Sequence, residues 1–190
     1  QMLKERIPVT LSLTLMSTIL SLLISFPLGY LAGIHKDIPG DHVVRGSALV
    51  AIAMPSFWVA LLLMLLFSVK LRWLPAGGWG TTVWDHIRGL ILPSLTQAIA
   101  TSAILIRNIR NSVVEISVMD YVDFARSKGI SEKEVRDHHI LRNTLISTVT
   151  LLSMRVAYML GGSVILETIY ALPGIGKLMV DSIFGRDYVV

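Results

Sequence analysis

Three long stretches of this sequence contain no charged residue, and they constrain the fold more than any other feature. They are residues 7–34, 46–69 and 89–106, which hold 28, 24 and 18 residues. About 20 apolar residues in an α-helix cross the ~30 Å hydrocarbon core of a bilayer. Because that core offers no water to backbone groups, a spanning stretch of this kind must be helical. The sequence therefore predicts an all-α membrane protein with several spans.

Composition supports the membrane class and excludes two others. Of the 190 residues, 53% are hydrophobic and 16% are charged, whereas a soluble domain carries about 25% charged residues. The net charge is only +4 and the basic residues concentrate in one loop, so nucleic acid is not expected as a partner. Without cysteine the chain has no disulfide framework and no thiolate metal site.

The boundaries of the uncharged runs predict four spans within one membrane domain, residues 1–190. The spans cover residues 9–34, 46–69, 89–107 and 144–166. A cytoplasmic loop is expected over residues 107–143 and an outer re-entrant segment over residues 167–188. Prolines and a glycine modify the helices: Pro27 and Gly29 are expected to kink the first span, and Pro93 fits the first turn of the third.

The loop over residues 107–143 is dense in charge, and membrane spans lie on both sides of it. It holds seven basic and six acidic residues. The basic residues are Arg107, Arg110, Arg126, Lys128, Lys133, Arg136 and Arg142. The acidic residues are Glu115, Asp120, Asp123, Glu132, Glu134 and Asp137. A charged island between spans is where a membrane protein meets something soluble, although a solvated face explains any single charge equally well.

Capping residues divide this loop into two short helices. Asp120 is suited to cap a helix over residues 121–128, and Gly129 to end it in the left-handed conformation. Ser131 and Glu134 fit a capping box, which predicts a second helix over residues 132–139. Helices this short need a surface on which to pack. One face of the first helix is formed by Tyr121, Phe124 and Ala125.

Two segments of the loop resemble a known family. Residues 120–129 read DYVDFARSKG, and residues 139–143 read HILRN. They are similar to the cytoplasmic coupling loop of ABC importer permeases, above all the dipeptide, oligopeptide and nickel branch. The family pattern is Glu-Ala-Ala, three residues and Gly; Asp123-Phe124-Ala125 and Gly129 stand at those positions. Asn143 replaces the later Pro of the general pattern, as is common in the peptide branch.

The resemblance implies a permease-like helical bundle of the type I ABC importer class. The family has six spans, so this sequence corresponds to the middle of the family pattern. In such a machine, separate subunits bind ATP and the permease itself holds no cofactor. The helix over residues 132–139 is the expected ATPase docking element. The implied coupling residues are Asp123, Ala125, Gly129, Ser131, Glu132, Glu134, Val135 and His139.

The resemblance also implies the partners and the location. The partners are a second, similar permease, two ABC ATPase subunits, an extracytoplasmic substrate-binding protein and the lipid bilayer. The protein is expected to cross the inner membrane several times, with the large charged loop on the cytoplasmic side. The cargo stays open among peptides, nickel chelates and related small solutes.

A translocation path is expected along spans two and four, facing the second permease. Residues 167–176 resemble the outer re-entrant segment of the same branch. The candidates for lining the path are Pro55, Trp58, Arg155, Gly162 and Glu167. Two of these have structural alternatives: Pro55 also fits an ordinary packed kink, and Gly162, with Gly161, fits close helix packing.

Arg155 is charged and lies near the middle of the fourth predicted span. A guanidinium at that depth requires an acceptor or water. It either pairs with a partner helix or backbone carbonyls, or it faces a water-filled path and attracts an anionic cargo group. The family has no fixed basic residue there, so the resemblance favours neither alternative.

Two other classes of membrane protein fit the sequence less well. A secondary transporter or channel with its own ion coupling usually carries carboxylates at mid-membrane, and the first three spans hold no Asp or Glu. An intramembrane enzyme needs catalytic groups, and the spans contain neither His-Glu-x-x-His nor Gly-x-Ser-x-Gly. The sequence also lacks the Gly-x-x-x-x-Gly-Lys-Ser/Thr motif of a nucleotide site. A permease driven by separate ATPases is therefore favoured.

Overall fold

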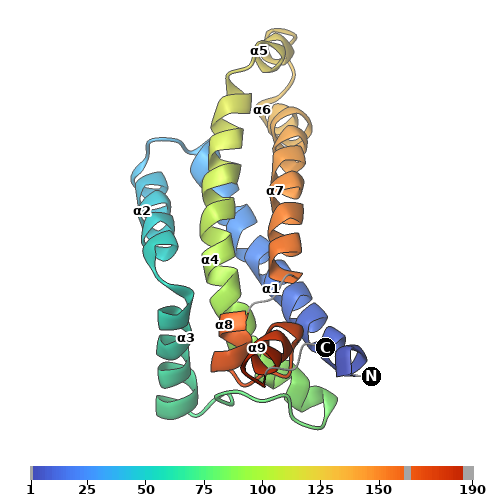
Figure 1. Ribbon diagram of the computed structural model, residues 1–190. Helices are drawn as coiled ribbons and strands as arrows, with labels where there is room; N and C mark the ends of the chain where they lie inside the picture. Colours follow the sequence, from blue (N-terminus) through green and yellow to red (C-terminus); the bar gives the residue numbers. More distant parts are fainter. Residues whose placement is uncertain (1, 161–163, 186–190) are drawn as a thin grey trace. The chain divides into compact units, whose positions relative to one another are not determined.

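The computed structural model describes residues 2–160 and 164–185, which form helices and no strand (Figure 1). This confirms the all-α class. The α-helices are α1 (Met2–Ile34), α2 (Pro39–Ala53), α3 (Ser56–Met64), α4 (Val83–Ser117), α5 (Asp120–Ser127), α6 (Glu132–Glu134), α7 (Arg142–Leu160), α8 (Val164–Ile169) and α9 (Ile175–Gly185). Two π-helical segments, Leu65–Lys70 and Val135–Leu141, extend α3 and join α6 to α7.

The chain forms two compact units, each assembled from separate stretches of sequence. Unit 1 contains Gln1–Leu20, Met54–Ala100 and Arg155–Val190, and unit 2 contains Ser21–Ala53 and Thr101–Met154. Helices α1, α4 and α7 contribute residues to both units. Each unit has its own buried hydrophobic cluster.

Among the described residues, α1 and α4 are long and apolar enough to cross a membrane, whereas α2 and α3 meet the same criterion only when they are counted together as one broken element. The predicted second span is thus split, because Pro55 has an extended backbone (ψ 136°) and stands at the N-cap of α3. Helix α4 begins at Val83, earlier than predicted, since Thr82 and Asp85 cap it reciprocally. Pro93 therefore lies inside α4 and not in its first turn.

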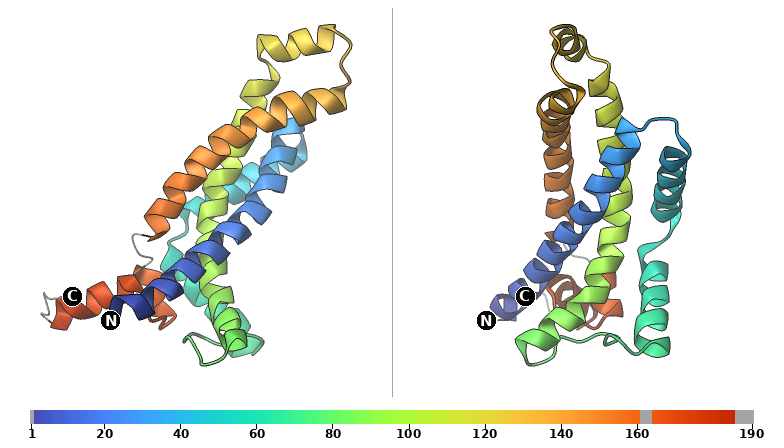
Figure 2. Two further views of the ribbon diagram at one scale, coloured as in Figure 1. Left: turned by 90° about the vertical axis from the view of Figure 1, so that its right-hand side faces the viewer. Right: turned by 180° about the vertical axis from the view of Figure 1, so that it is seen from behind.

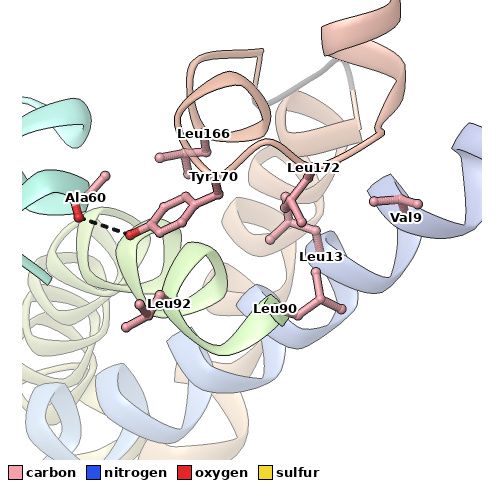
Figure 3. Close-up of a cluster of buried hydrophobic side chains, with 8 residues drawn as sticks. All are labelled: Val9, Leu13, Ala60, Leu90, Leu92, Leu166, Tyr170 and Leu172. Carbon is pink, nitrogen blue, oxygen red and sulfur yellow. Dashed lines mark hydrogen bonds between the residues drawn. The ribbon is translucent and has the colours of Figure 1, made fainter. Parts of the chain in front are cut away.

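Tyr170 organises the core of unit 1 (Figure 3). Its side chain is fully buried, and its hydroxyl lies 3.2 Å from the carbonyl oxygen of Ala60 in α3 and 2.9 Å from the hydroxyl of Thr96 in α4. The residues around it in this cluster are Val9, Leu13, Leu90, Leu92, Leu166 and Leu172.

A buried carboxylate fixes the segment that follows α8. Glu167 is fully buried and accepts hydrogen bonds from the Thr10 hydroxyl at 3.0 Å and from the Lys177 N–H at 2.9 Å. Thr10 in turn accepts from the Ile175 N–H at 3.0 Å. A carboxylate at the first turn of α9 satisfies free N–H groups and opposes the positive end of the helix dipole.

In unit 2, helix α1 packs closely on α4 through two glycines one turn apart. A Cβ at Gly29 would lie 2.9 Å from the Ile106 carbonyl oxygen, and a Cβ at Gly33 would lie 2.6 Å from Cβ of Val113. Small residues at this spacing let two membrane helices approach. Helix α1 continues past Pro27 and Gly29 to Ile34, so neither residue ends it.

Replacing Tyr170 with Phe tests the core of unit 1. The change removes one hydroxyl and leaves Ala60 and Thr96 without this partner, so the free energy of unfolding should fall by about 1–3 kcal/mol. Tyr158→Phe is the matched control, because that side chain is 81% exposed. Thermal unfolding of the purified protein in detergent gives both values. Equal melting temperatures for the two variants would contradict the role assigned to Tyr170.

Candidate functional site

The charged loop of unit 2 is a folded structure that begins where α4 ends. Two residues with a bend separate α4 from α5, and Met119 has an extended backbone (ψ 144°) at the N-cap of α5. Asp120 is the first residue of the helix and not its cap, so the predicted capping role is wrong. Asp120 and Asp123 still lie in the first turn, where a negative charge is favoured by the helix dipole.

Helix α5 has a buried face that attaches it to unit 2. Val122 is fully buried and Ala125 is 4% exposed. They pack in one cluster with Val113 and Ile116 of α4 and with Val135 and Ile140 of the following helical segment. This packing supplies the surface that so short a helix requires.

The opposite side of α5 exposes large apolar side chains. Phe124 is 60% exposed and Tyr121 is 39% exposed, and Val118 and Met119 are exposed beside them. The Lys128 ammonium lies 4.5 Å from the centre of the Phe124 ring. We call these five residues the α5 face. An apolar surface rimmed by charges is typical of a protein-binding site.

Arg126 ties three parts of the loop together. Its guanidinium donates to the Ser117 carbonyl oxygen at the end of α4 (3.1 Å), to Asp123 in α5 (2.9 Å) and to Glu132 in α6 (2.9 Å). Partial burial disfavours its charge, but the hydrogen bonds to both carboxylates outweigh that effect and raise the pKa of Arg126. The group therefore stays charged and fixes the orientation of α5 relative to its neighbours.

The turn after α5 follows the sequence prediction. Gly129 has φ +81°, the left-handed conformation that glycine adopts without strain, and no atom lies within 4 Å of the place where a Cβ would be. Ser131 then caps α6, because its hydroxyl accepts from the Glu134 N–H at 3.3 Å. No hydrogen bond returns from the Glu134 side chain, so only half of the predicted capping box is present in the described loop.

The predicted second short helix is not separate. Residues 132–160 are helical without interruption, from α6 through the π-helical segment into α7 (Figure 2). In a π-helix the backbone bonds connect residues i and i+5, which suits the burial of both Val135 and Ile140 on one side. Helix α5 is therefore the separate helix of the loop, and residues 132–139 form the N-terminal part of the continuous helix that leads into α7.

Aromatic and amide side chains connect α5 and the π-helical segment to the rest of unit 2. The Asn143 amide donates to the Tyr121 hydroxyl at 3.0 Å, and the Tyr121 and His139 rings lie 6.3 Å apart. From α1, the Tyr30 hydroxyl reaches the Arg136 carbonyl oxygen at 3.4 Å. These contacts and the Arg126 hydrogen bonds make the loop one rigid body within unit 2.

The structure brings most of the predicted coupling residues into this body. Asp123, Gly129, Ser131, Glu132 and Glu134 are exposed, whereas Ala125 and Val135 are buried supports and His139 is half-buried. The predicted coupling residues did not include Arg126, Tyr121, Phe124 or Asn143. The predicted common face of Tyr121, Phe124 and Ala125 is divided, because Ala125 is buried while Tyr121 and Phe124 are exposed. For Arg126 the sequence holds a signal, because an arginine three residues after one acid and six before another suggests a bridging ion pair.

The predicted path residues that the structure describes belong to unit 1. Pro55 starts α3, and Trp58 is 43% exposed one turn later. Arg155 is half-buried in α7 and has no hydrogen-bond or ion-pair partner among the residues described. Glu167 is enclosed by the protein, so its carboxylate is a structural acceptor and the expected path-lining role is not supported. Gly162 lies outside the described residues.

These features define a helical membrane protein whose spans carry a structured, charged loop with an exposed apolar face. The chain belongs to the family of binding-protein-dependent transport system inner membrane components, which matches residues 25–189. The resemblance stated from the coupling loop is thereby confirmed.

Curated relatives agree with this assignment. The oligopeptide transport system permease protein AppB of Bacillus subtilis (strain 168) is 39% identical over 195 aligned positions, which cover 100% of this chain and 62% of that protein. The glutathione transport system permease protein GsiC of Salmonella choleraesuis (strain SC-B67) is 39% identical over 181 positions, covering 95% and 58%. The chain thus spans about three fifths of the length of these relatives.

Two solved structures share the fold at low sequence identity. One is an inward-facing conformation of the MetNI methionine ABC transporter, with a TM-score of 0.75, 14% identity and coverage of 99% of this chain and 83% of that one. The other is an amino acid ABC transporter with histidines, with a TM-score of 0.70, 17% identity and coverage of 99% and 81%. The fold of this chain is therefore that of ABC transporter membrane subunits.

Arg126→Met tests whether this residue holds the loop together. Losing the three hydrogen bonds should destabilise α5 locally by about 1–2 kcal/mol, because exposed ion pairs contribute little and the bond to Ser117 adds to them. Amides of residues 120–128 should then exchange with deuterium about tenfold faster. Lys133→Met, at an exposed position of α6, is the matched control. Unchanged exchange in Arg126→Met would refute the rigid loop.

Proposed function

We propose that this chain is the permease subunit of an ATP-driven importer and that ATPase subunits dock on the α5 face. One observation carries the proposal: α5 presents exposed Phe124 and Tyr121 while its other side is anchored by Val122, Ala125 and Arg126. Because α5 is fixed on its buried side, a movement of a soluble partner bound to its apolar face is transmitted to α4 and α7. The ATP site belongs to the partner, in line with the absence of a Gly-x-x-x-x-Gly-Lys-Ser/Thr motif here.

The docking element proposed from the structure differs from the one that the sequence suggested. Residues 132–139 continue into α7, so they are better placed to receive a motion than to form the separate docking helix. Helix α5 contacts residues 132–140 through Val135, Ile140 and Glu132. A force on α5 therefore passes into the α7 helix through packing and through one ion pair.

The cargo we propose is a peptide or peptide-like solute. This follows from the names of the relatives, which transport oligopeptides in one case and glutathione in another. The proposed partners are a second, similar permease, a pair of ATPase subunits and an extracytoplasmic binding protein that delivers the cargo. The cargo path is proposed to run between the two permeases, with Trp58 and Arg155 facing it.

Arg155 is consistent with that path. It lies in unit 1 and finds no acceptor among the described residues. Of the two alternatives drawn from the sequence, pairing within this chain has no support in the described contacts. A guanidinium that stays charged must then meet water, a cargo carboxylate or a group on another subunit.

Phe124→Asp tests the docking face directly. A carboxylate at the centre of an apolar interface has no partner there, and losing an aromatic anchor typically weakens binding by 2 kcal/mol or more, about thirtyfold. We expect ATPase subunits to be lost when the complete transporter is purified through the permease. Phe184→Asp, in α9 of unit 1 and 85% exposed, is the matched control. Equal ATPase recovery from both variants would exclude the α5 face as the docking site.

Gly129→Val tests the angle between α5 and the helix after it. A β-branched residue resists φ +81°, and since no neighbouring atom is close, the effect is backbone strain of about 1–2 kcal/mol without a steric clash. We expect the ATPase subunits to bind but cargo-stimulated ATP hydrolysis in membranes to fall severalfold. Gly129→Asn should retain most coupling, because asparagine tolerates the left-handed region. Normal coupling in Gly129→Val would contradict the proposal.

A further inference from the structure

A groove in unit 2 between α2 and α4 has chemically different ends. Its cavity is about 280 Å³ in volume. The apolar end is lined by Ala48, Leu49, Ile52 and Ile106, and Ala48 packs there against Ala103 and Ile106. Leu49 and Ile52 are exposed, at 58% and 42%. This end is a hydrophobic wall open to its surroundings.

The other end of the groove is cationic. It is lined by Arg45, Arg107, Arg110 and Asn111, and no acidic residue lines the cavity. Arg110 is held by Asp41, whose carboxylate accepts from Nε at 3.1 Å and from the terminal nitrogen at 2.7 Å. The Asp41 side chain is fully buried, and it also accepts a hydrogen bond from the Asp37 N–H at 3.1 Å.

Arg45 and Arg107 are not neutralised in this way. Both are exposed, and neither has an ion-pair or hydrogen-bond partner in the described parts of the chain. The cavity is lined by three guanidinium groups, of which Asp41 matches one, so Arg45 and Arg107 leave a surplus of positive charge along the lining. The Asn111 amide adds neutral donors to the same end.

The groove lies at the edge of the apolar region of both helices. Arg45 directly precedes the uncharged run of residues 46–69, and Arg107 directly follows the uncharged run of residues 89–106. The cationic end is therefore at the level where α2 and α4 leave the hydrocarbon, and the apolar end faces into it. It is the same end of α4 that leads into α5.

We propose that this groove binds an anionic phospholipid, with Arg45 and Arg107 on the headgroup phosphate and an acyl chain along Leu49 and Ile52. Guanidinium groups bind phosphate through paired N–H donors, and basic pockets between membrane helices hold anionic headgroups. A soluble anion would bind the arginines but would make no contact that requires the apolar end of the groove. The site is additional to the transport function and does not depend on the identity of the cargo.

The test uses the complete transporter in detergent, with bound lipids counted by native mass spectrometry. Phosphatidylglycerol and phosphatidylcholine with the same acyl chains are titrated separately. Each arginine near a headgroup contributes about 1 kcal/mol, so Arg107→Gln should weaken phosphatidylglycerol binding about fivefold and the pair Arg45→Gln with Arg107→Gln more than tenfold. The control pair Lys36→Gln with Arg142→Gln removes equal charge outside the groove and should leave binding unchanged.

Several results would overturn the proposal. These are equal binding of both lipids by the wild type, equal phosphatidylglycerol binding by the groove and control variants, or absence of bound phosphatidylglycerol from the wild-type transporter. Glycerophosphoglycerol, the same headgroup without acyl chains, separates lipid from soluble anion: competition at the lipid's own concentration would also overturn it. Arg107→Gln is the variant of choice if the double variant fails to assemble, because this exposed side chain makes no contact that folding needs.

Discussion

A bilayer core supplies no hydrogen-bond partners, so polar groups inside it must be satisfied by the protein itself. The break between α2 and α3 at Pro55 meets this requirement: the Pro55 carbonyl oxygen accepts from the N–H groups of Trp58 (3.0 Å) and Val59 (3.2 Å). Near the turn after α8, Glu167 of α8 accepts from Thr10 and Lys177, and the Tyr170 hydroxyl bonds to α3 and α4. Unit 1 tolerates irregular backbone because these buried groups replace water.

The loop over residues 107–143 is under a different constraint, because its short helices are exposed to water and would be unstable alone. Burial of Val122 and Ala125 supplies the apolar area, and Arg126 supplies the orientation. Together these contacts fix α5 in place, while its outer face stays exposed to a partner. In the proposed transporter, this rigidity lets closure of the ATPase subunits reach α7.

Arginines have three different roles in unit 2, and the surroundings decide which. Arg110 is matched by a buried carboxylate and holds α2 to α4. Arg126 connects elements within the loop. Arg45 and Arg107 have no hydrogen-bond or ion-pair partner among the described residues and lie beside an apolar wall, which is the basis of the proposed lipid site. The guanidinium group suits all three because it stays charged and offers several donors in one plane.

The sequence by itself determined the membrane class, the all-α fold, the family and the left-handed turn at Gly129, because these depend on composition, local spacing and single-residue backbone preferences. It could not show that residues 132–139 join α7, since helix caps and breaks are local signals that packing of Val135 and Ile140 overrides. It also could not assign Glu167 to the interior or Phe124 to the surface. Burial is decided by contacts between residues far apart in the chain, such as Thr10 with Glu167, and only the tertiary structure fixes those.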